Sequence, residues 1–383
     1  MKGFKQISSA MLSSLILLII FSVNISALAV DTKNSPHILS EGVPGDVVAY
    51  ATNCYVEHLQ VAVHNPDSFD LPVNDLSLYM LGHPFKQYMD DTSYSTYYFP
   101  VIYSGTVVGI LTVTDMGSRI TSSYSKAFAE ALNEFFRSQT GDFIITQMQG
   151  DLFALSDNHS FLLCEGPENS SCALASNSTC AFDTITESVD FKNHLSATDL
   201  TASLPTPVVI RSDPGAPLEH RSLAVKPILQ LDNSWCWAAC CAMVINYKQD
   251  LSLTSRDIVD YVRGGEYEGG ASWPEMKLAY NHWGLDPGEL PALDYTDVKD
   301  RIKADDPIHM GLFTSDGETG HSMVLKGYER YTDAKYYVAI DPYIGSGVSL
   351  RVESNPEDIS YNCAGFLLYW KYARCLLYTS DAA

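Results

Sequence analysis

The chain has 383 residues, of which 46% are hydrophobic and 18% are charged, a composition typical of folded globular protein rather than of disorder. This length is sufficient for two domains of ordinary size. The formal net charge of −22 and the pI of about 4.6 argue against a nucleic acid or an anionic membrane surface as a partner.

Residues 1–29 are predicted to be a secretory signal peptide. Lys2 and Lys5 give a positive start, an apolar run spans Met11–Val23, and Ala27-Leu-Ala29 matches an A-x-A cleavage site. The run is too short for a comfortable membrane span, and no second long apolar stretch follows. We therefore expect a protein that is secreted or held outside the cell envelope, without stable membrane insertion. An uncleaved signal anchor is the alternative.

Residues 30–166 are expected to form a separate small α+β domain, in which no catalytic constellation is visible. Alternating and helical spacings of apolar residues carry this expectation. They predict a strand, a hairpin that turns at Ser104-Gly105, a helix and two more strands, over Gly45–Tyr50, Thr96–Asp115, Ser122–Ser138, Phe143–Met148 and Phe153–Leu155 in that order.

Residues 167–207 are predicted to be a polar linker, because Ser, Thr, Asn and Asp dominate there. Cys164, Cys172 and Cys180 are each eight residues from the next, a spacing too wide for a zinc knuckle, and no histidine lies among them. A local disulfide with one leftover thiol is the expectation for an exported protein. The pairing stays open among Cys54, Cys164, Cys172, Cys180 and Cys363.

Residues 208–374 are globular again. Helical patterns come first, with a capping box at Thr254–Asp257 and Pro274 at a helix start, and strand patterns follow from Pro307. We expect a helical half-domain and an antiparallel sheet with a substrate cleft between them. The segment 375–383, Cys375–Ala383, resembles the translation of a sequencing adapter, so we treat it as a non-native tail.

Four groups in the last half of the sequence carry the candidate chemistry: Gln230, Cys236, His321 and Asp341. Cys236 opens an apolar, helix-like run that ends at Tyr247. A thiol at a helix N-terminus faces free N–H groups and the positive end of the helix dipole, which lowers its pKa. The thiolate that results is the form a cysteine nucleophile needs.

His321 and Asp341 are expected to meet across a β-hairpin. The segments His321–Tyr328 and Lys335–Asp341 both have strand patterns. A turn centred on Tyr331 places the imidazole directly opposite the carboxylate, where Cβ atoms are about 4.5–5.5 Å apart. A slip of one residue would break this match, so the register is a real constraint.

Other cysteines and histidines of this region are set aside. Cys240 and Cys241 lie a full turn inside the helix and are expected to be core residues. A metal pair of Cys236 and Cys240 with His321 is the less favoured alternative. His282 and His309 lack a carboxylate partner in register and are expected to be structural.

At these residues the chain resembles the papain-like cysteine peptidases, and most closely their bacterial C39-like branch. The resemblance rests on Gln230 six positions before Cys236-Trp-Ala, on Gly-His321 and on Asp341-Pro, and it covers about residues 208–370. It implies that Cys236 is the nucleophile, His321 the general base and acid, Asp341 the orienting residue and Gln230 the oxyanion donor. It implies no metal and no organic cofactor.

The resemblance further implies a secreted peptidase made as a zymogen, with a protein or peptide as substrate. On this hypothesis the segment 30–207 is a prodomain plus linker that inhibits the enzyme and is removed near Ser203–Leu223. A permanent N-terminal domain that directs the substrate is the rival. The lip of the cleft is expected to include Trp237, Tyr267 and Trp273.

Two other functions are the alternatives. One is acyl transfer, as in transglutaminases, by the same triad. The other is a non-catalytic surface-binding module on a peptidase fold, which the four intact groups disfavour.

Overall fold

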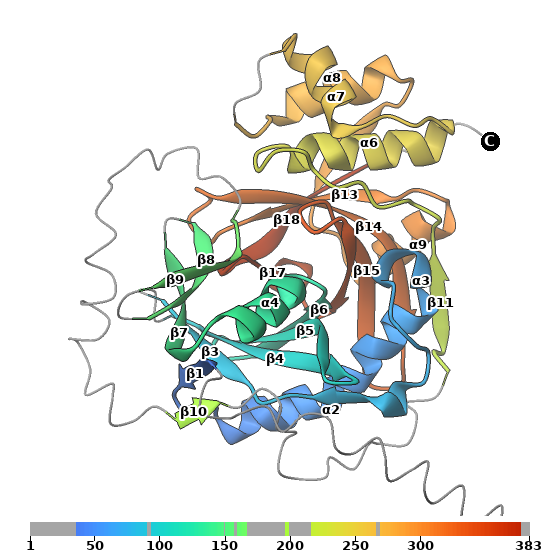
Figure 1. The fold of residues 1–383 in the computed structure, drawn as a ribbon. Helices are drawn as coiled ribbons and strands as arrows, with labels where there is room; N and C mark the ends of the chain where they lie inside the picture. Colours follow the sequence, from blue (N-terminus) through green and yellow to red (C-terminus); the bar gives the residue numbers. More distant parts are fainter. Residues whose placement is uncertain are drawn as a thin grey trace, which may run out of the picture.

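The fold is known from a computed structural model that describes residues 36–89, 93–148, 150–156, 159–166, 196–198, 216–265 and 269–376. The predicted signal peptide, nearly all of the predicted linker, and residues 377–383 lie outside these ranges, as do Cys172 and Cys180. We call residues 36–166 the N-terminal half and residues 216–376 the C-terminal half. Together they are a mixed α/β structure with a large, mainly antiparallel sheet (Figure 1).

The N-terminal half contains three α-helices, one short 3₁₀ helix (Leu76–Leu78) and nine strands within its described residues. The helices are α2 (Gly45–His64), α3 (Pro66–Phe69) and α4 (Ala129–Ser138). The strands are β1 (Pro36–Ser40), β2 (Tyr79–Leu81), β3 (Phe85–Tyr88), β4 (Ser95–Tyr103), β5 (Thr106–Asp115), β6 (Ile120–Ser125), β7 (Gly141–Met148), β8 (Asp151–Leu155) and β9 (Ser160–Cys164).

Two predictions for this half are wrong. The expected strand Gly45–Tyr50 is the first part of α2, whose buried positions recur at helical spacing through Val47, Ala51 and Cys54, beyond the short window that looked strand-like. The expected helix Ser122–Ser138 begins only at Ala129, because its first residues pair on both edges as strand β6. The hairpin that turns at Ser104-Gly105 and the two later strands are confirmed.

The C-terminal half has most of its sheet after its helices, in line with the prediction, but two short strands, Glu219–Ser222 and Pro287–Pro291, precede its last helix. A short strand β10 (Ser196–Thr198) precedes it and pairs with β1. The helices are α6 (Cys236–Gln249), α7 (Ser255–Arg263), α8 (Trp273–His282) and α9 (Tyr295–Lys303). The strands are β11 (Glu219–Ser222), β12 (Pro287–Pro291), β13 (Ile308–Phe313), β14 (Gly320–Arg330), β15 (Lys335–Asp341), β16 (Ser346–Arg351), β17 (Ser360–Cys363) and β18 (Phe366–Leu376).

One sheet runs through both halves. In the C-terminal half its strands follow one another in the order β12, β18, β13, β14, β15 and β16. The last of these pairs antiparallel with β6, where Ser349 faces Tyr124, and β5 and β4 continue the sheet. The expected separation into two domains is therefore not confirmed.

A shared core joins the halves on one face of this sheet. It combines apolar residues of α2 and β4–β6 with Tyr331, Tyr336 and Val338 of the C-terminal half. Buried polar contacts lie beside it: Lys326 Nζ donates to Ser68 Oγ at 2.9 Å and Asn65 Nδ2 to Glu329 Oε1 at 3.2 Å. Removing the N-terminal half would uncover this core and leave β16 as an open edge strand, which is a hazard for aggregation.

Helices α6, α7 and α8 form a layer at one end of the sheet, with α6 next to the strands (Figure 1). Ten successive residues of α6, Cys236–Ile245, are buried, because sheet and helices cover it from both sides. None of the helices in the described ranges is long and apolar enough to span a membrane.

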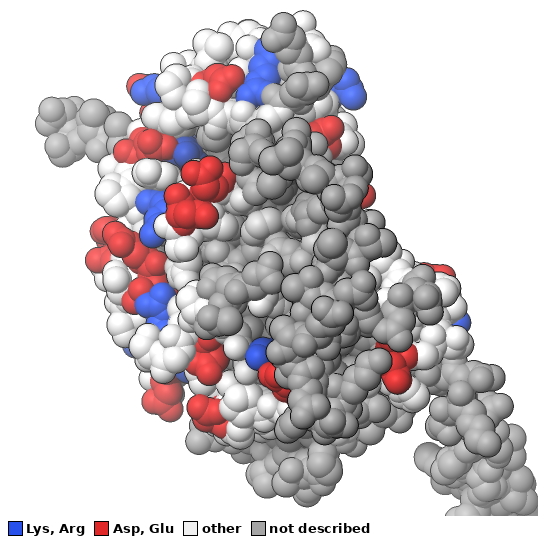
Figure 2. Space-filling model, turned by 90° about the vertical axis from the view of Figure 1, so that its left-hand side faces the viewer, with Lys and Arg blue, Asp and Glu red and all other residues white. Residues whose placement is uncertain are grey.

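Acidic side chains outnumber basic ones on the described part of the face in Figure 2, in line with the formal charge of −22. At the C-terminal end, two residues that the sequence analysis placed in the non-native tail lie in β18. Cys375 pairs with Gly288 and is 2% exposed, and Leu376 pairs with Pro287.

Candidate functional site

Cys236 is the first residue of α6. The preceding loop makes a turn in which the Trp235 N–H donates to Asp232 O, and the helix continues into the buried core. The thiol thus lies at the positive end of the helix dipole, as the sequence predicts. Its side chain is 8% exposed, so it is nearly closed off from solvent.

His321 and Asp341 lie on neighbouring strands β14 and β15, and His321 Nε2 is 2.7 Å from Asp341 Oδ1. The expectation that these two residues lie directly opposite each other is wrong. Near the turn Arg330 pairs with Lys335, and beyond an irregularity at Lys326 the register shifts by one residue. Continued to the end of β15, the shifted register puts Asp341 two positions away from His321.

The irregularity at Lys326 is what brings the two side chains to the same face. Side chains alternate between faces with a period of two, so an offset of two residues keeps them together. With the register found at the turn, the offset would be three residues and the two side chains would lie on opposite faces. A β-bulge of this kind inserts one residue and re-aims everything beyond it.

Asp341 is fully buried, and both of its carboxylate oxygens are satisfied. Oδ1 accepts from His321 and also from the Tyr343 N–H at 2.8 Å, while Oδ2 accepts from the Tyr361 hydroxyl at 2.8 Å. A buried carboxylate is expensive unless it has such donors. Sequence reasoning missed Tyr361, because β17 lies 20 residues beyond Asp341 and carries no local signal.

The three side chains of Cys236, His321 and Asp341 form one chain of contacts. Since Asp341 occupies Nε2 of His321, Nδ1 is the ring nitrogen left for the hydrogen bond with Cys236. Burial disfavours the charged imidazole, but the Asp341 carboxylate and Cys236 outweigh it and raise the pKa of His321 to about 10. Burial also disfavours the thiolate, but the His321 hydrogen bond and charge outweigh it and lower the pKa of Cys236.

Opposite shifts of this kind favour a thiolate next to an imidazolium at neutral pH. The backbone groups of Ser322 and Trp237 add hydrogen bonds to the sulfur. The pair can therefore attack an electrophilic carbonyl and afterwards return a proton.

Gln230 lies beside this chain, since its backbone N–H donates to Pro342 O at 2.8 Å. Its Nε2 donates to Asp232 O at 2.9 Å and to Asn233 O at 3.0 Å, while its Oε1 is buried without a partner. Both amide protons are thus used within the loop that leads to Cys236. For Gln230 to donate to an oxyanion, one of these carbonyl contacts has to be released.

Of the three residues expected at the lip of the cleft, the structure describes two, Trp237 and Trp273. Trp237 is 1% exposed and packs in the core, with the Arg263 guanidinium 5.4 Å from its ring. Its direction is therefore inward, because α6 is covered on both sides. Trp273 is partly buried against the same core, and Tyr267 lies outside the described residues.

The residues that were set aside as structural occupy structural positions. Cys240 and Cys241 are fully buried, and burial raises the pKa of both thiols. His309 is buried and bonds Tyr280 at 2.9 Å, and His282 stacks on Tyr261 at 3.7 Å.

A second cysteine and histidine meet in the N-terminal half. Cys54 and His58 lie one turn apart on α2 and share Ser122 Oγ, at 3.7 and 2.9 Å. Burial raises the pKa of Cys54 to about 12 and lowers that of His58 well below its usual range. Both groups are therefore neutral. The other ring nitrogen of His58 bonds Ser349 Oγ at 2.9 Å, so both nitrogens bond serine hydroxyls, and no carboxylate of the described residues orients this histidine.

The end of β9 touches the candidate site. Asn233, three residues before the thiol, donates to Glu165 Oε2 at 3.2 Å, and the Gly166 N–H is held by Asp151 at 2.7 Å. Cys164, a free thiol, hydrogen-bonds Tyr343. The N-terminal half thus contacts the loop in front of Cys236.

Residues 220–353 match the family model described as papain-like cysteine protease AvrRpt2. These residues are a papain-like cysteine protease domain. They include Gln230, Cys236, His321 and Asp341, so the expected resemblance to papain-like enzymes is confirmed over this span.

Among the solved structures, 34 chains match this protein. One is the crystal structure of a Bacillus anthracis protein assigned as a C39-like peptidase, at 15% identity, covering 36% of this chain and 99% of that one with a TM-score of 0.25. No curated protein matches the chain.

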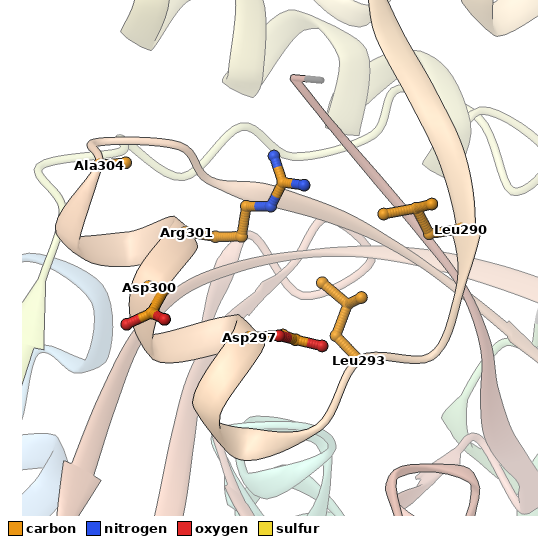
Figure 3. A pocket seen from close by; sticks show the side chains of 6 residues that line it. All are labelled: Leu290, Leu293, Asp297, Asp300, Arg301 and Ala304. Atoms are coloured by element: carbon orange, nitrogen blue, oxygen red, sulfur yellow. The ribbon is translucent and has the colours of Figure 1, made fainter. Parts of the chain in front are cut away.

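A cavity of about 270 Å³ lies elsewhere within residues 220–353, between α9 and β12. Figure 3 shows Arg301 and Leu290 facing each other across it. Arg301 also bonds the Leu376 carbonyl of β18. The cavity contains none of the candidate site residues, since its lining is Leu290, Leu293, Asp297, Asp300, Arg301 and Ala304.

Proposed function

We propose that this protein is a secreted cysteine peptidase that hydrolyses peptide bonds through Cys236, His321 and Asp341. The observation that carries the proposal is the buried chain of contacts among these three side chains. It places a thiol at a helix N-terminus against an imidazole that a carboxylate orients. Membership of residues 220–353 in the papain-like cysteine proteases supports the same chemistry.

In the proposed reaction, the Cys236 thiolate attacks the carbonyl carbon of a peptide bond and forms a carbon–sulfur bond. The carbon–nitrogen bond then breaks, and His321 gives its proton to the leaving amine. Next, His321 takes a proton from water, which attacks the thioester and releases the acid and the thiolate. Asp341 holds the imidazole in one orientation throughout and stabilises its charged form.

The oxyanion of each tetrahedral intermediate needs donors in place. We assign this role to the Gln230 side chain with the Cys236 backbone N–H. Donors of this kind are worth roughly 2.7–4 kcal/mol each in other enzymes. Here Gln230 Nε2 has to exchange one of its carbonyl partners, Asp232 O or Asn233 O, for the oxyanion.

We propose further that the chain is made as a zymogen. The contact between Glu165 and Asn233 and the 8% exposure of Cys236 support a closed form. The shared sheet argues against complete removal of residues 30–207. It favours the rival hypothesis, in which the N-terminal half is retained. Cleavage would then fall before β11, which pairs with β14, and would free the end of β9 to leave the loop.

Labelling by an epoxide inhibitor of papain-like enzymes tests the nucleophile. We expect labelling of the processed protein and its loss in Cys236→Ala. Labelling together with cleavage of casein supports a peptidase, whereas labelling with amine incorporation alone supports acyl transfer. No labelling of the processed wild-type protein would contradict both and leave a non-catalytic module. N-terminal sequencing of the secreted protein tests removal of the signal peptide and the cut after it.

A further inference from the structure

Strand β17 lies between the candidate triad and the N-terminal half. Its residues alternate, as those of a strand must. Tyr361 faces the triad and donates to Asp341 Oδ2 at 2.8 Å. Cys363 faces the same way, since its sulfur, a nitrogen of His321 and an oxygen of Asp341 all lie within 4.8 Å of one another.

The other two residues of β17 face the N-terminal half. Ser360 Oγ lies 3.0 Å from Thr121 Oγ1 on β6. The Asn362 side chain bonds two residues of β4, with the Tyr98 hydroxyl at 3.1 Å and Thr96 Oγ1 at 3.3 Å. All of these groups are buried, so each contact takes the place of a hydrogen bond that the group would otherwise make with water.

The turn after β17 is held by the same half. Ala364 and Gly365 both have positive φ, as the two central residues of a tight hairpin do. Gln87 Nε2 donates to Gly365 O at 3.1 Å, and a Cβ added at Gly365 would lie 2.6 Å from that nitrogen. The N-terminal half therefore contacts β17 along its length and also holds the turn that follows it.

We propose that Tyr361 is a positioning residue for Asp341, and that the N-terminal half holds β17 where Tyr361 can reach the carboxylate. This rests on the proposed peptidase function. On this proposal the N-terminal half both covers the candidate triad and helps to hold it in its active geometry. The N-terminal half therefore has to stay bound to the C-terminal half after any cut in the linker.

The surroundings of Asp341 make the Tyr361 contact important. Asp341 is fully buried and has two other donors, His321 and the Tyr343 N–H, both on Oδ1. Burial, with the neighbouring Asp341 charge, raises the pKa of Tyr361 well above its usual value, so its hydroxyl stays a donor. Among the described residues, the other titratable groups that face this cluster include Cys236 and Cys240 of α6, Cys363 of β17, Cys164 of β9 and the Tyr343 side chain.

Loss of the Tyr361 hydroxyl weakens the hold of Asp341 on His321. The pKa of His321 should then fall and that of Cys236 should rise, so the pH window of the thiolate–imidazolium pair narrows from both ends. If Tyr361 had only a structural role, its loss would lower the amount of folded protein and leave the pKa of His321 and of Cys236 unchanged.

The test uses the full chain carrying Tyr361→Phe. We expect kcat to fall about tenfold with KM within twofold, as for loss of a hydrogen bond to a charged group. We also expect the acidic limb of Cys236 alkylation by iodoacetamide to move to higher pH, because the thiolate is the form that is alkylated. Tyr372→Phe is the matched control, because it removes a hydroxyl from the neighbouring strand β18 at a side chain that is 42% exposed.

A second variant addresses the N-terminal half. Asn362→Ala breaks the contacts to β4 without touching Asp341, and it should move the acidic limb of alkylation in the same direction by a smaller amount. An unchanged acidic limb in both variants would overturn the inference. Because alkylation needs no substrate, it separates this result from failure of the proposed function, which would show as absent cleavage by a wild-type protein whose thiol is still alkylated at low pH.

Discussion

His321 Nε2 and Asp341 Oδ1 lie 2.7 Å apart although the two residues are offset by two positions along their strands. The bulge at Lys326 makes this offset even, and an even offset keeps both side chains on one face. The bulge residue is itself 3% exposed and donates to Ser68 of the N-terminal half. The geometry of the candidate triad thus depends on one inserted residue and on a contact 258 residues away in sequence.

Deleting Lys326 should separate His321 from Asp341. One residue fewer in β14 turns every side chain before the bulge to the other face. We expect peptidase activity to be lost and the Cys236 alkylation rate at pH 7 to fall to that of an ordinary buried thiol. Lys326→Ser keeps the chain length and the bulge, so it is the matched control, and activity in the folded deletion variant would contradict the role given to the bulge.

His321→Ala should lower kcat by roughly 10⁴-fold or more, as removal of a triad member does in other enzymes. The matched substitution is His58→Ala, which removes the other histidine that lies near a cysteine. It should leave kcat within twofold and lower the free energy of unfolding by about 1–3 kcal/mol, because two buried serine hydroxyls lose their partner. Steady-state kinetics and urea unfolding measure the two effects, and a large loss of kcat in His58→Ala would argue for a second site.

Asp341→Asn should narrow the pH range of activity. The carboxylate raises the pKa of His321 to about 10, so its loss lets the imidazolium deprotonate at lower pH and moves the alkaline limb down. The thiolate then loses its counter-charge, so the acidic limb moves up. The pH dependence of kcat/KM measures both limbs. Asp306→Asn, at a buried carboxyl outside the site, should move neither, and an unmoved alkaline limb in Asp341→Asn would refute the assigned coupling.

Gln230→Ala should lower kcat by about 10²–10³-fold if the amide reaches the oxyanion during the reaction. Gln230→Glu has the same length but cannot donate, so it should be equally slow. Alkylation of Cys236 by iodoacetamide, which forms no oxyanion, should proceed at the wild-type rate in both variants. If kcat stays within threefold in both, Gln230 serves only to hold the loop through Asp232 and Asn233.

A cut in the linker should leave the two halves together. We would place a recognition site for a sequence-specific protease within residues 171–190 and compare the products by size-exclusion chromatography with and without denaturant. The shared sheet across β6 and β16 and the core around Tyr336 predict one native species that separates only in denaturant. Two separate native species, with an active fragment of residues 208–376, would restore the hypothesis of a removable prodomain.

Much of the C-terminal half is predictable because its signals are local. The helix that begins at Cys236 follows from an apolar run, and the capping box at Thr254 and Asp257 marks the start of α7. The strand patterns of β14 and β15 are also local, but their register is not. The bulge left no mark in the alternation of a strand whose every residue from His321 to Glu329 is buried.

The sequence by itself determines which groups are present and in what order: Gln230, a thiol at a helix start, then His321 and Asp341. Such identities and periodicities are properties of a few neighbouring residues. Only the tertiary structure decides that Tyr361 bonds Asp341, that Trp237 points inward, and that β6 extends the sheet of the protease domain. These outcomes depend on pairings between distant segments, whose free energy comes from burial and from hydrogen bonds that no local pattern encodes.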